Sequence, residues 1–154
     1  MRRLEFGPLP KDAHVDPRET WPEALTAAVA QLGEYFARAR RVFDLPLDLE
    51  AATDFQREVY AELVRIPFGR VITYGELAET LSRPDGARAV GQAVGANPIP
   101  ILIPCHRVVA AEGRLGGFSG GLAVKAVLLR VENVDVEGES ETSRIRPEIL
   151  RLDL

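Results

Sequence analysis

The chain has 154 residues, enough for one domain with a hydrophobic core and a small appendage. Its net charge of −4 and its pI near 5.3 argue against a protein that binds nucleic acid through charge alone. A single cysteine excludes an internal disulfide, and with two separated histidines it does not make a usual structural zinc site. The sequence shows neither an apolar run of membrane-spanning length nor a signal-peptide pattern. We therefore expect a cytoplasmic protein with no membrane partner and a reduced thiol.

Two helices are predicted within the first 66 residues. Residues 1–19 have closely spaced prolines and little periodicity, which predicts no more than a short strand or a loose arm. From Pro22 to about Val42 apolar residues recur at helical spacing, with the proline near the first turn, where its missing amide costs little. An extended linker then leads to a second helix that ends at Ile66 and that either Thr53 or Asp54 can cap.

A helix-turn-helix pattern follows a short extended piece at residues 71–73. A helix is predicted over residues 74–81, a break over 82–86 and a second helix over 87–96. An ordinary helical hairpin gives the same pattern, but the second helix has mostly small side chains and one cation, Arg88, near its start. Its exposed amides can hold phosphate, and its small side chains suit a narrow groove, so we expect docking in the minor groove of DNA. The alternative for an isolated arginine is an ion pair with an acidic neighbour on the surface.

The only cysteine lies in the tetrad Pro104-Cys105-His106-Arg107. A thiol needs help to lose its proton near neutral pH, and a nearby imidazole is the usual helper. A lone cysteine is more often an inert core residue. Here the apolar run at residues 101–103 ends at a proline, which leads the chain into an irregular turn where Cys105 can face a cavity. If the backbone is extended at this point, His106 points away from Cys105 and a bridging water or a small twist is needed.

The tetrad and its surroundings resemble a known family. The segments 97–109, 116–122 and 128–133 are similar to those of the O6-alkylguanine-DNA alkyltransferases, also called methylated-DNA–protein-cysteine methyltransferases, and the likeness extends over residues 55–133. The resemblance implies repair of DNA by direct damage reversal. An alkyl group passes irreversibly, once per molecule, from O6-alkylguanine to Cys105 after minor-groove binding and base flipping, and O4-alkylthymine is a second candidate lesion. It further implies a single-turnover enzyme that uses no cofactor and no metal, has double-stranded DNA carrying O6-alkylguanine as its partner, and acts as a monomer.

The resemblance also implies a role for each matching residue. Cys105 would accept the alkyl group, His106 and Glu132 would draw off its proton through a bridging water, and Asn97 would order the turn around them. Arg88 would fill the gap left by the extruded nucleotide. The residues expected to bind the flipped base are Tyr74, Val108, Phe118, Ser119, Gly120 and Lys125. Those expected at the DNA surface, besides Arg88, are Thr73, Ala87, Ala89 and Gly91.

The expected fold class is α/β (α+β). A small amino-terminal domain, residues 1–51, holds one helix and has room for a short sheet. A mainly helical DNA-binding and alkyl-acceptor domain, residues 52–134, contains the helix-turn-helix and a short strand pair around Cys105. An acidic tail, residues 135–154, is expected to be loosely ordered.

Two other functions remain open at this stage. A lesion-binding module without catalysis would use the same fold, but its relatives replace the acceptor thiol, which is intact here. A cysteine hydrolase using Cys105, His106 and Glu132 would turn over many times on an ester or amide. Stoichiometry separates the hydrolase from the alkyltransferase.

Overall fold

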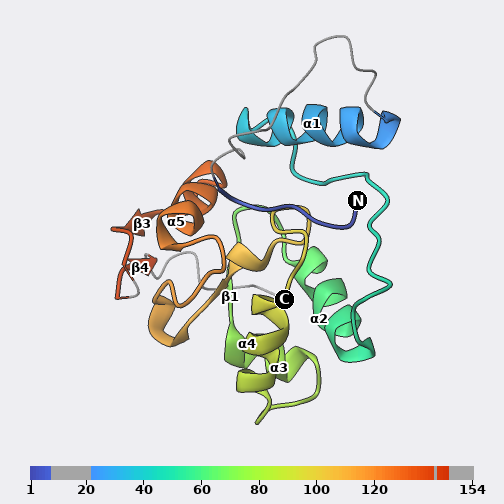
Figure 1. Cartoon of the computed structure of the whole chain (residues 1–154). Coiled ribbons are helices and arrows are strands. Elements are labelled where there is room, and N and C mark those ends of the chain that lie inside the picture. Colours follow the sequence, from blue (N-terminus) through green and yellow to red (C-terminus); the bar gives the residue numbers. More distant parts are fainter. Residues whose placement is uncertain (8–21, 141, 146–154) are drawn as a thin grey trace.

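The computed structural model describes residues 1–7, 22–140 and 142–145. The predictions for most of residues 1–19 and for the last nine residues therefore lie outside the described part of the chain. Within that part, the α-helices are α1 (Glu23–Phe36), α2 (Asp54–Arg65), α3 (Tyr74–Thr80), α4 (Ala87–Gly95) and α5 (Leu122–Val131). Short strand pairs complete the mixed α and β architecture that the sequence predicts (Figure 1).

The first two helices confirm the expected starts, but the first is shorter than predicted. Helix α1 ends at Phe36, six residues before the predicted end at Val42. Arg38 has a φ of 61°, a left-handed conformation that cannot continue a right-handed helix. Helix α2 begins after Thr53, whose side chain accepts a hydrogen bond from the Gln56 amide while the Gln56 side chain accepts one from the Thr53 amide.

Helices α3 and α4 form the predicted helix-turn-helix (Figure 1). Thr73 caps α3 through the same reciprocal pair of hydrogen bonds, here with Glu76. The chain leaves α3 through Ser82, at a φ of 56°, and enters α4 from Gly86, which offers no side-chain cap to the first amides of α4. Those amides therefore lack the usual side-chain acceptor at the end of the helix where the dipole is positive.

A short parallel strand pair lies near the cysteine, as predicted, and its second strand follows the tetrad in the chain. Strand β1 (Ile72–Thr73) pairs with β2 (Val108–Val109), with Ile72 opposite Val108. The tetrad itself is not extended, because Cys105–Arg107 form the 3-10 helix η1. The helical turn replaces the alternating geometry under which neighbouring side chains point to opposite sides. A second 3-10 segment, η2 (Ala111–Gly113), follows β2.

The expectation of a loosely ordered tail is wrong as far as Ile145. Strand β3 (Val136–Glu137) pairs with β4 (Arg144–Ile145) in an antiparallel hairpin beside α5 (Figure 1). Val134, Val136 and Ile145 are buried in a common core cluster with Leu129. Acidic composition outweighed these few, spaced apolar residues in the sequence-based interpretation, yet their burial is what holds the hairpin.

The main core draws on both predicted domains. Tyr35 from α1 is fully buried in the same cluster as Leu63 of α2 and Val90 of α4. The first residues also lie across the body of the molecule, with the Leu4 amide donating to the Pro98 carbonyl at 2.9 Å (Figure 1). A domain boundary near residue 51 remains a prediction, and the main core cluster contains residues from both sides of it.

Candidate active site

Cys105 begins η1 and lies at the wall of a cavity of about 260 Å³. Its side chain is buried, with only 3 % of the residue exposed, so the sulfur meets the outside through this cavity. Predicted substrate-binding residues and small residues of α4 also line this cavity. The complete lining is Tyr74, Gly91, Val94, Gly95, Cys105, Gly117, Phe118 and Ser119. The predicted acceptor and part of the predicted base pocket therefore share one cavity.

The surroundings of Cys105 keep its thiol protonated at rest. Burial raises the pKa of Cys105. A hydrogen bond from Asn97, the charge of Lys125 and the backbone amides of Cys105 and His106 oppose that effect without cancelling it. A nucleophile in this state needs a base that accepts the proton when the reaction begins.

Asn97 ties together the two ends of the turn that precedes Cys105. Its Nδ2 donates to the Ile103 carbonyl at 2.8 Å, and its Oδ1 accepts from the Ile99 amide at 3.0 Å. Between these points Ile101 has a φ of 73°, a costly conformation for a β-branched residue. The buried amide of Asn97 thus holds a strained turn that places the thiol.

His106 has the geometry of a general base. Its Nε2 lies 2.8 Å from Oε1 of Glu132, and since that oxygen belongs to an ionised carboxylate, Nε2 carries the proton. Nδ1 is then an acceptor, and it is the one fully buried side-chain nitrogen or oxygen of the described residues without a hydrogen-bond partner. Burial lowers the pKa of His106, although the hydrogen bond and charge of Glu132 act against this. The ring is therefore neutral at rest and has one lone pair free.

Glu132 accepts hydrogen bonds from three separate parts of the chain. It is the C-cap of α5 and is 1 % exposed. Besides His106, Tyr35 Oη donates to Oε1 at 2.9 Å, the Gly69 amide donates to Oε2 at 3.0 Å, and Arg107 Nη2 and Nε donate to Oε1 and Oε2, both at 2.9 Å. Burial alone would raise the pKa of Glu132, but the hydrogen bonds and charges of His106 and Arg107 hold it at about 2. We call these five residues the Glu132 cluster.

Three members of the Glu132 cluster were not predicted as functional, and one of them, Gly69, contributes only its backbone amide. Arg107 belongs to the tetrad, and its pairing with a buried acid could have been suspected because a buried guanidinium needs an acceptor. Tyr35 lies on the apolar face of α1, where its hydroxyl carries no signal that distinguishes it from a core aromatic.

Lys125 supports the wall of the cavity from below. It is fully buried, and Nζ donates to the carbonyls of Val108 at 2.7 Å, of Gly117 at 3.3 Å and of Leu115. Burial lowers its pKa to about 8, while the nearby Cys105 acts in the opposite direction. Val108 does not line the cavity, since its carbonyl is turned to Lys125.

The loop between η2 and α5 borders two cavities. Ser119 lines both the Cys105 cavity and a neighbouring one of about 420 Å³, where Gly120, Asn97 and Phe6 also lie. The ring of Phe6 contacts that of Phe118 with 5.8 Å between centroids. The amino-terminal segment therefore supports the outer wall of the Cys105 cavity.

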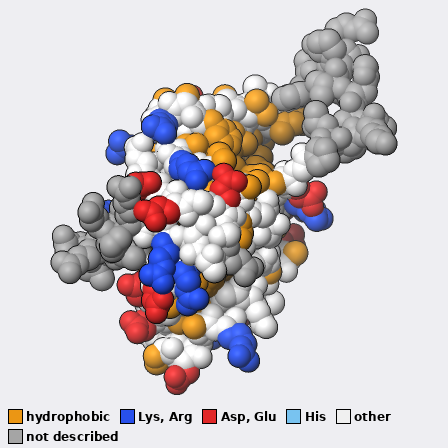
Figure 2. Space-filling view, turned by 90° about the vertical axis from the view of Figure 1, so that its left-hand side faces the viewer, with side chains coloured by type: hydrophobic (Ala, Val, Ile, Leu, Met, Phe, Trp, Pro, Cys, Tyr) orange, Lys and Arg blue, Asp and Glu red, His pale blue; other side chains and the backbone are white. Residues whose placement is uncertain are grey.

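Helix α4 runs from the surface to the Cys105 cavity. Arg88 and Ala89 are exposed near its start, Ala87 is half-buried, and Gly91 lines the cavity beside the Tyr74 ring. Within the described residues no ion pair or hydrogen bond holds the Arg88 guanidinium, so the surface ion pair considered above does not form there. Thr73, the fifth predicted DNA contact, caps α3. On the face in Figure 2 basic and acidic side chains are interspersed, so charge alone does not mark a DNA surface there.

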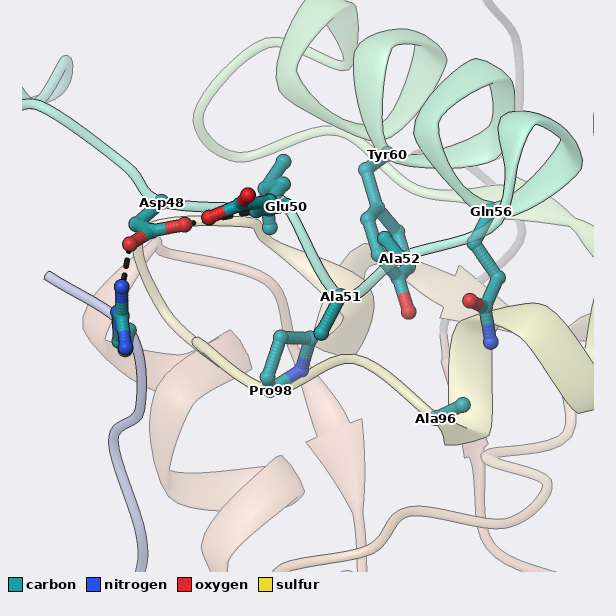
Figure 3. Close-up of a pocket in the computed structure, with 10 residues that line it drawn as sticks. Asp48, Glu50, Ala51, Ala52, Gln56, Tyr60, Ala96 and Pro98 are labelled. Atoms are coloured by element: carbon teal, nitrogen blue, oxygen red, sulfur yellow. Dashed lines mark hydrogen bonds and ion pairs between the residues drawn. The ribbon is translucent and has the colours of Figure 1, made fainter.

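A larger cavity, of about 450 Å³, lies apart from Cys105, between the linker to α2, α2 itself and the end of α4 (Figure 3). Tyr60 and Gln56 point into it from α2, and no predicted site residue lines it. In the described part of the chain no three potential metal ligands among His, Cys, Asp and Glu lie together. None of the described helices has the length and apolarity needed to cross a membrane.

Comparisons with known proteins match most of the chain. The family model of the 6-O-methylguanine DNA methyltransferase, DNA binding domain, matches residues 54–134. A methylated-DNA–protein-cysteine methyltransferase of Mycobacterium tuberculosis is 46 % identical over 132 residues, covering 86 % of this chain and 78 % of the relative.

Solved structures also match the chain. The M. tuberculosis OGT in complex with DNA matches with a TM-score of 0.67 and 48 % identity, over 70 % of this chain and 66 % of that one. S. pombe Atl1, in complex with damaged DNA containing O6-carboxymethylguanine, matches with a TM-score of 0.56 and 30 % identity, over 64 % of this chain and 95 % of that one.

Fold and site together define a helix-turn-helix protein with one buried thiol that lines a cavity and a buried, neutral imidazole at the next position in the chain. With these matches, the chain belongs to the 6-O-methylguanine DNA methyltransferase family. The resemblance drawn from the tetrad and its flanking segments is confirmed.

Proposed function

We propose that this protein repairs O6-alkylguanine in double-stranded DNA by transferring the alkyl group irreversibly to its own Cys105. It is thus a methylated-DNA–[protein]-cysteine S-methyltransferase that acts once per molecule. The observation that carries this proposal is the single thiol at the wall of a cavity, next to a neutral histidine with a free lone pair.

The first step is loss of the thiol proton. Through a bridging water, His106 Nδ1 accepts the proton of Cys105 and becomes an imidazolium. Glu132 stabilises that cation across the 2.8 Å contact to Nε2. The new thiolate lies close to the ammonium of Lys125 and to backbone amides that lower the pKa of Cys105. Negative charge thus forms where positive groups are already in place.

The second step is an in-line displacement. The sulfur forms a bond to the alkyl carbon, the bond from that carbon to O6 breaks, and its electron pair stays on the guanine. Tyr74 and Ser119 line the cavity with Cys105 and are the groups placed to donate a hydrogen bond or proton to the leaving base. Burial raises the pKa of Tyr74, so its hydroxyl keeps its proton until the base needs it.

The cavity can receive a base only after the nucleotide leaves the stack. Unstacking costs a few kcal/mol, and an inserted side chain can offset part of this cost. Arg88 is exposed at the start of α4, and the same helix lines the cavity through Gly91, Val94 and Gly95. The small side chains of α4 let its backbone approach the minor groove, with Thr73, Ala87 and Ala89 beside the contact.

The decisive experiment is intact-mass analysis. Protein mixed with a duplex carrying O6-methylguanine should gain one methyl group, located on Cys105 by peptide mapping, and then stop reacting. A Cys105→Ser variant and an undamaged duplex are the controls. Repeated turnover, or a Cys105 that stays unmodified after the lesion has been bound, would contradict the proposal in favour of the hydrolase or the lesion-binding module.

Several narrower features belong to the same proposal. The protein acts as a monomer in the cytoplasm, where a lone thiol stays reduced. It has a DNA-binding and alkyl-acceptor domain over residues 52–134, between an amino-terminal domain and a short carboxy-terminal segment. O4-alkylthymine is a second lesion to test in the same mass assay.

A further inference from the structure

We propose that the Tyr35 hydroxyl sets the basicity of His106 by sharing the Glu132 oxygen to which His106 is bound. Tyr35 would then be a positioning residue for the reaction, contributed by α1 and lying before the segment matched by the family model. The kinetic consequence rests on the proposed alkyl transfer, whereas the effect on the imidazole does not.

Tyr35 and His106 use the same acceptor atom. Tyr35 Oη donates to Glu132 Oε1 at 2.9 Å, His106 Nε2 lies 2.8 Å from that oxygen, and the two donors are 3.4 Å apart. A carboxylate oxygen that satisfies one donor has less charge to offer the next. Each hydrogen bond to Oε1 therefore weakens the hold of Glu132 on the imidazolium form of His106.

Tyr35 can act only as a donor here. Burial first, and then the neighbouring Glu132, raise the pKa of Tyr35 far above its ordinary value. The hydroxyl therefore stays protonated wherever the enzyme can be assayed. Its lone pairs do not compete for the Nε2 proton of His106, because the carboxylate is both nearer and charged.

Orientation of the carboxylate does not depend on Tyr35. Arg107 binds both oxygens through a fork of Nε and Nη2, and the Gly69 amide binds Oε2. The remaining charged group near the imidazole is Lys125, whose charge lowers the pKa of His106, as that of Arg107 does. All of these stay in place when only the hydroxyl of Tyr35 is removed.

The ring of Tyr35 is also held without its hydroxyl. It packs against Phe36, Phe43 and Phe68, with ring centroids 5.3, 5.5 and 6.0 Å apart. Phenylalanine should therefore occupy the same space. The Tyr35→Phe variant isolates one hydrogen bond to Oε1 from the packing of α1.

The sign of the effect follows from the lost donor. Without Tyr35, more of the charge on Oε1 is available to His106, so the imidazolium becomes more stable and the pKa of His106 rises. The acidic limb of the pH dependence of the alkyl-transfer rate constant should then move upward by about 0.5 to 1 pH unit, while the plateau does not fall. If Tyr35 served packing alone, Tyr35→Phe would leave the acidic limb where it is.

Tyr60→Phe is the matched control. Tyr60 is another buried tyrosine, at 2 % exposure, whose hydroxyl points into the larger cavity and has no hydrogen-bond partner in the described part of the chain (Figure 3). Its substitution should leave the acidic limb unchanged. An equal shift in both variants would show a general effect of lost hydroxyls and overturn the role of Tyr35.

A second measurement separates this inference from the proposed function. The chain has two histidines, so NMR titration of a histidine-labelled sample resolves His106 once a His14→Gln variant assigns it. Tyr35→Phe should raise the midpoint of the His106 titration, whether or not the protein transfers an alkyl group. An unchanged or lowered midpoint overturns the inference, and absence of alkyl transfer with a raised midpoint overturns only the proposed function.

Discussion

Replacing Glu132 by glutamine tests the structure of the site most directly. The amide has nearly the shape of the carboxylate, but its nitrogen would face donors that now find an acceptor, namely Arg107 and either His106 or the Gly69 amide. The variant therefore loses a buried ion pair and brings donor against donor, a change that costs about 3 to 5 kcal/mol in comparable cases.

The lowered pKa of Glu132, which arises from the same contacts, leads to a similar magnitude. It is held at about 2, against 4.5 for an ordinary glutamate, which corresponds to about 3 kcal/mol of stability at neutral pH. The folded pKa is the lower one, so this stability is present above about pH 4.5 and is lost as the pH falls toward 2. Wild type and variant should therefore differ most near pH 7 and converge in acid.

Urea denaturation at several pH values measures this difference. Glu34→Gln is the control, because Glu34 pairs with Arg40 near the surface and should lose little stability. A loss below about 1 kcal/mol for Glu132→Gln at pH 7, or a loss independent of pH, would refute the reasoning from the buried pair.

Two further predictions concern the walls of the site. A Cβ at Gly120 would lie 2.5 Å from the Phe6 ring and 2.9 Å from the Phe118 ring, so Gly120→Ala should lower the free energy of unfolding by about 1 to 3 kcal/mol. The control is Gly117→Ala, which should be neutral because nothing lies within 4 Å of a Cβ there. Equal unfolding temperatures for the two variants would disprove the predicted clash at Gly120. Arg88→Ala should slow transfer from a duplex about tenfold or more while leaving transfer from free O6-benzylguanine unchanged, and equal slowing of both would remove Arg88 as the residue that fills the base stack.

Local signals in the sequence predict most of the frame around the site. Each helix cap, at Thr53 and at Thr73, is formed by a threonine and the side chain three positions later, so a short stretch of sequence is enough to predict it. The break between α3 and α4 at residues 82–86 likewise depends on neighbouring residues alone. In the strand pair, β1 matches the extended piece predicted at residues 71–73, and β2 directly follows the tetrad. Cys105 and His106 stand out because the chain has so few residues of their types.

The contacts within the Glu132 cluster could not be predicted in this way. Its donors come from Tyr35, Gly69 and the tetrad, so the carboxylate is satisfied only when α1, the turn after α2 and α5 pack together. Periodicity shows that Tyr35 faces the core, but it does not show which polar atom its hydroxyl will meet. The end of α1 was missed for a related reason, since the left-handed Arg38 leaves no mark in the apolar pattern.

Because Cys105 is the single thiol of the chain, its alkylation would mark every molecule that has already reacted. The chain has no second cysteine, and the one it has lines the cavity that would admit a damaged base. Every repaired lesion would thus convert one reactive thiol permanently into a thioether. The fraction of chains whose Cys105 no longer reacts with a small thiol reagent would therefore give the number of alkyl groups removed from DNA per chain.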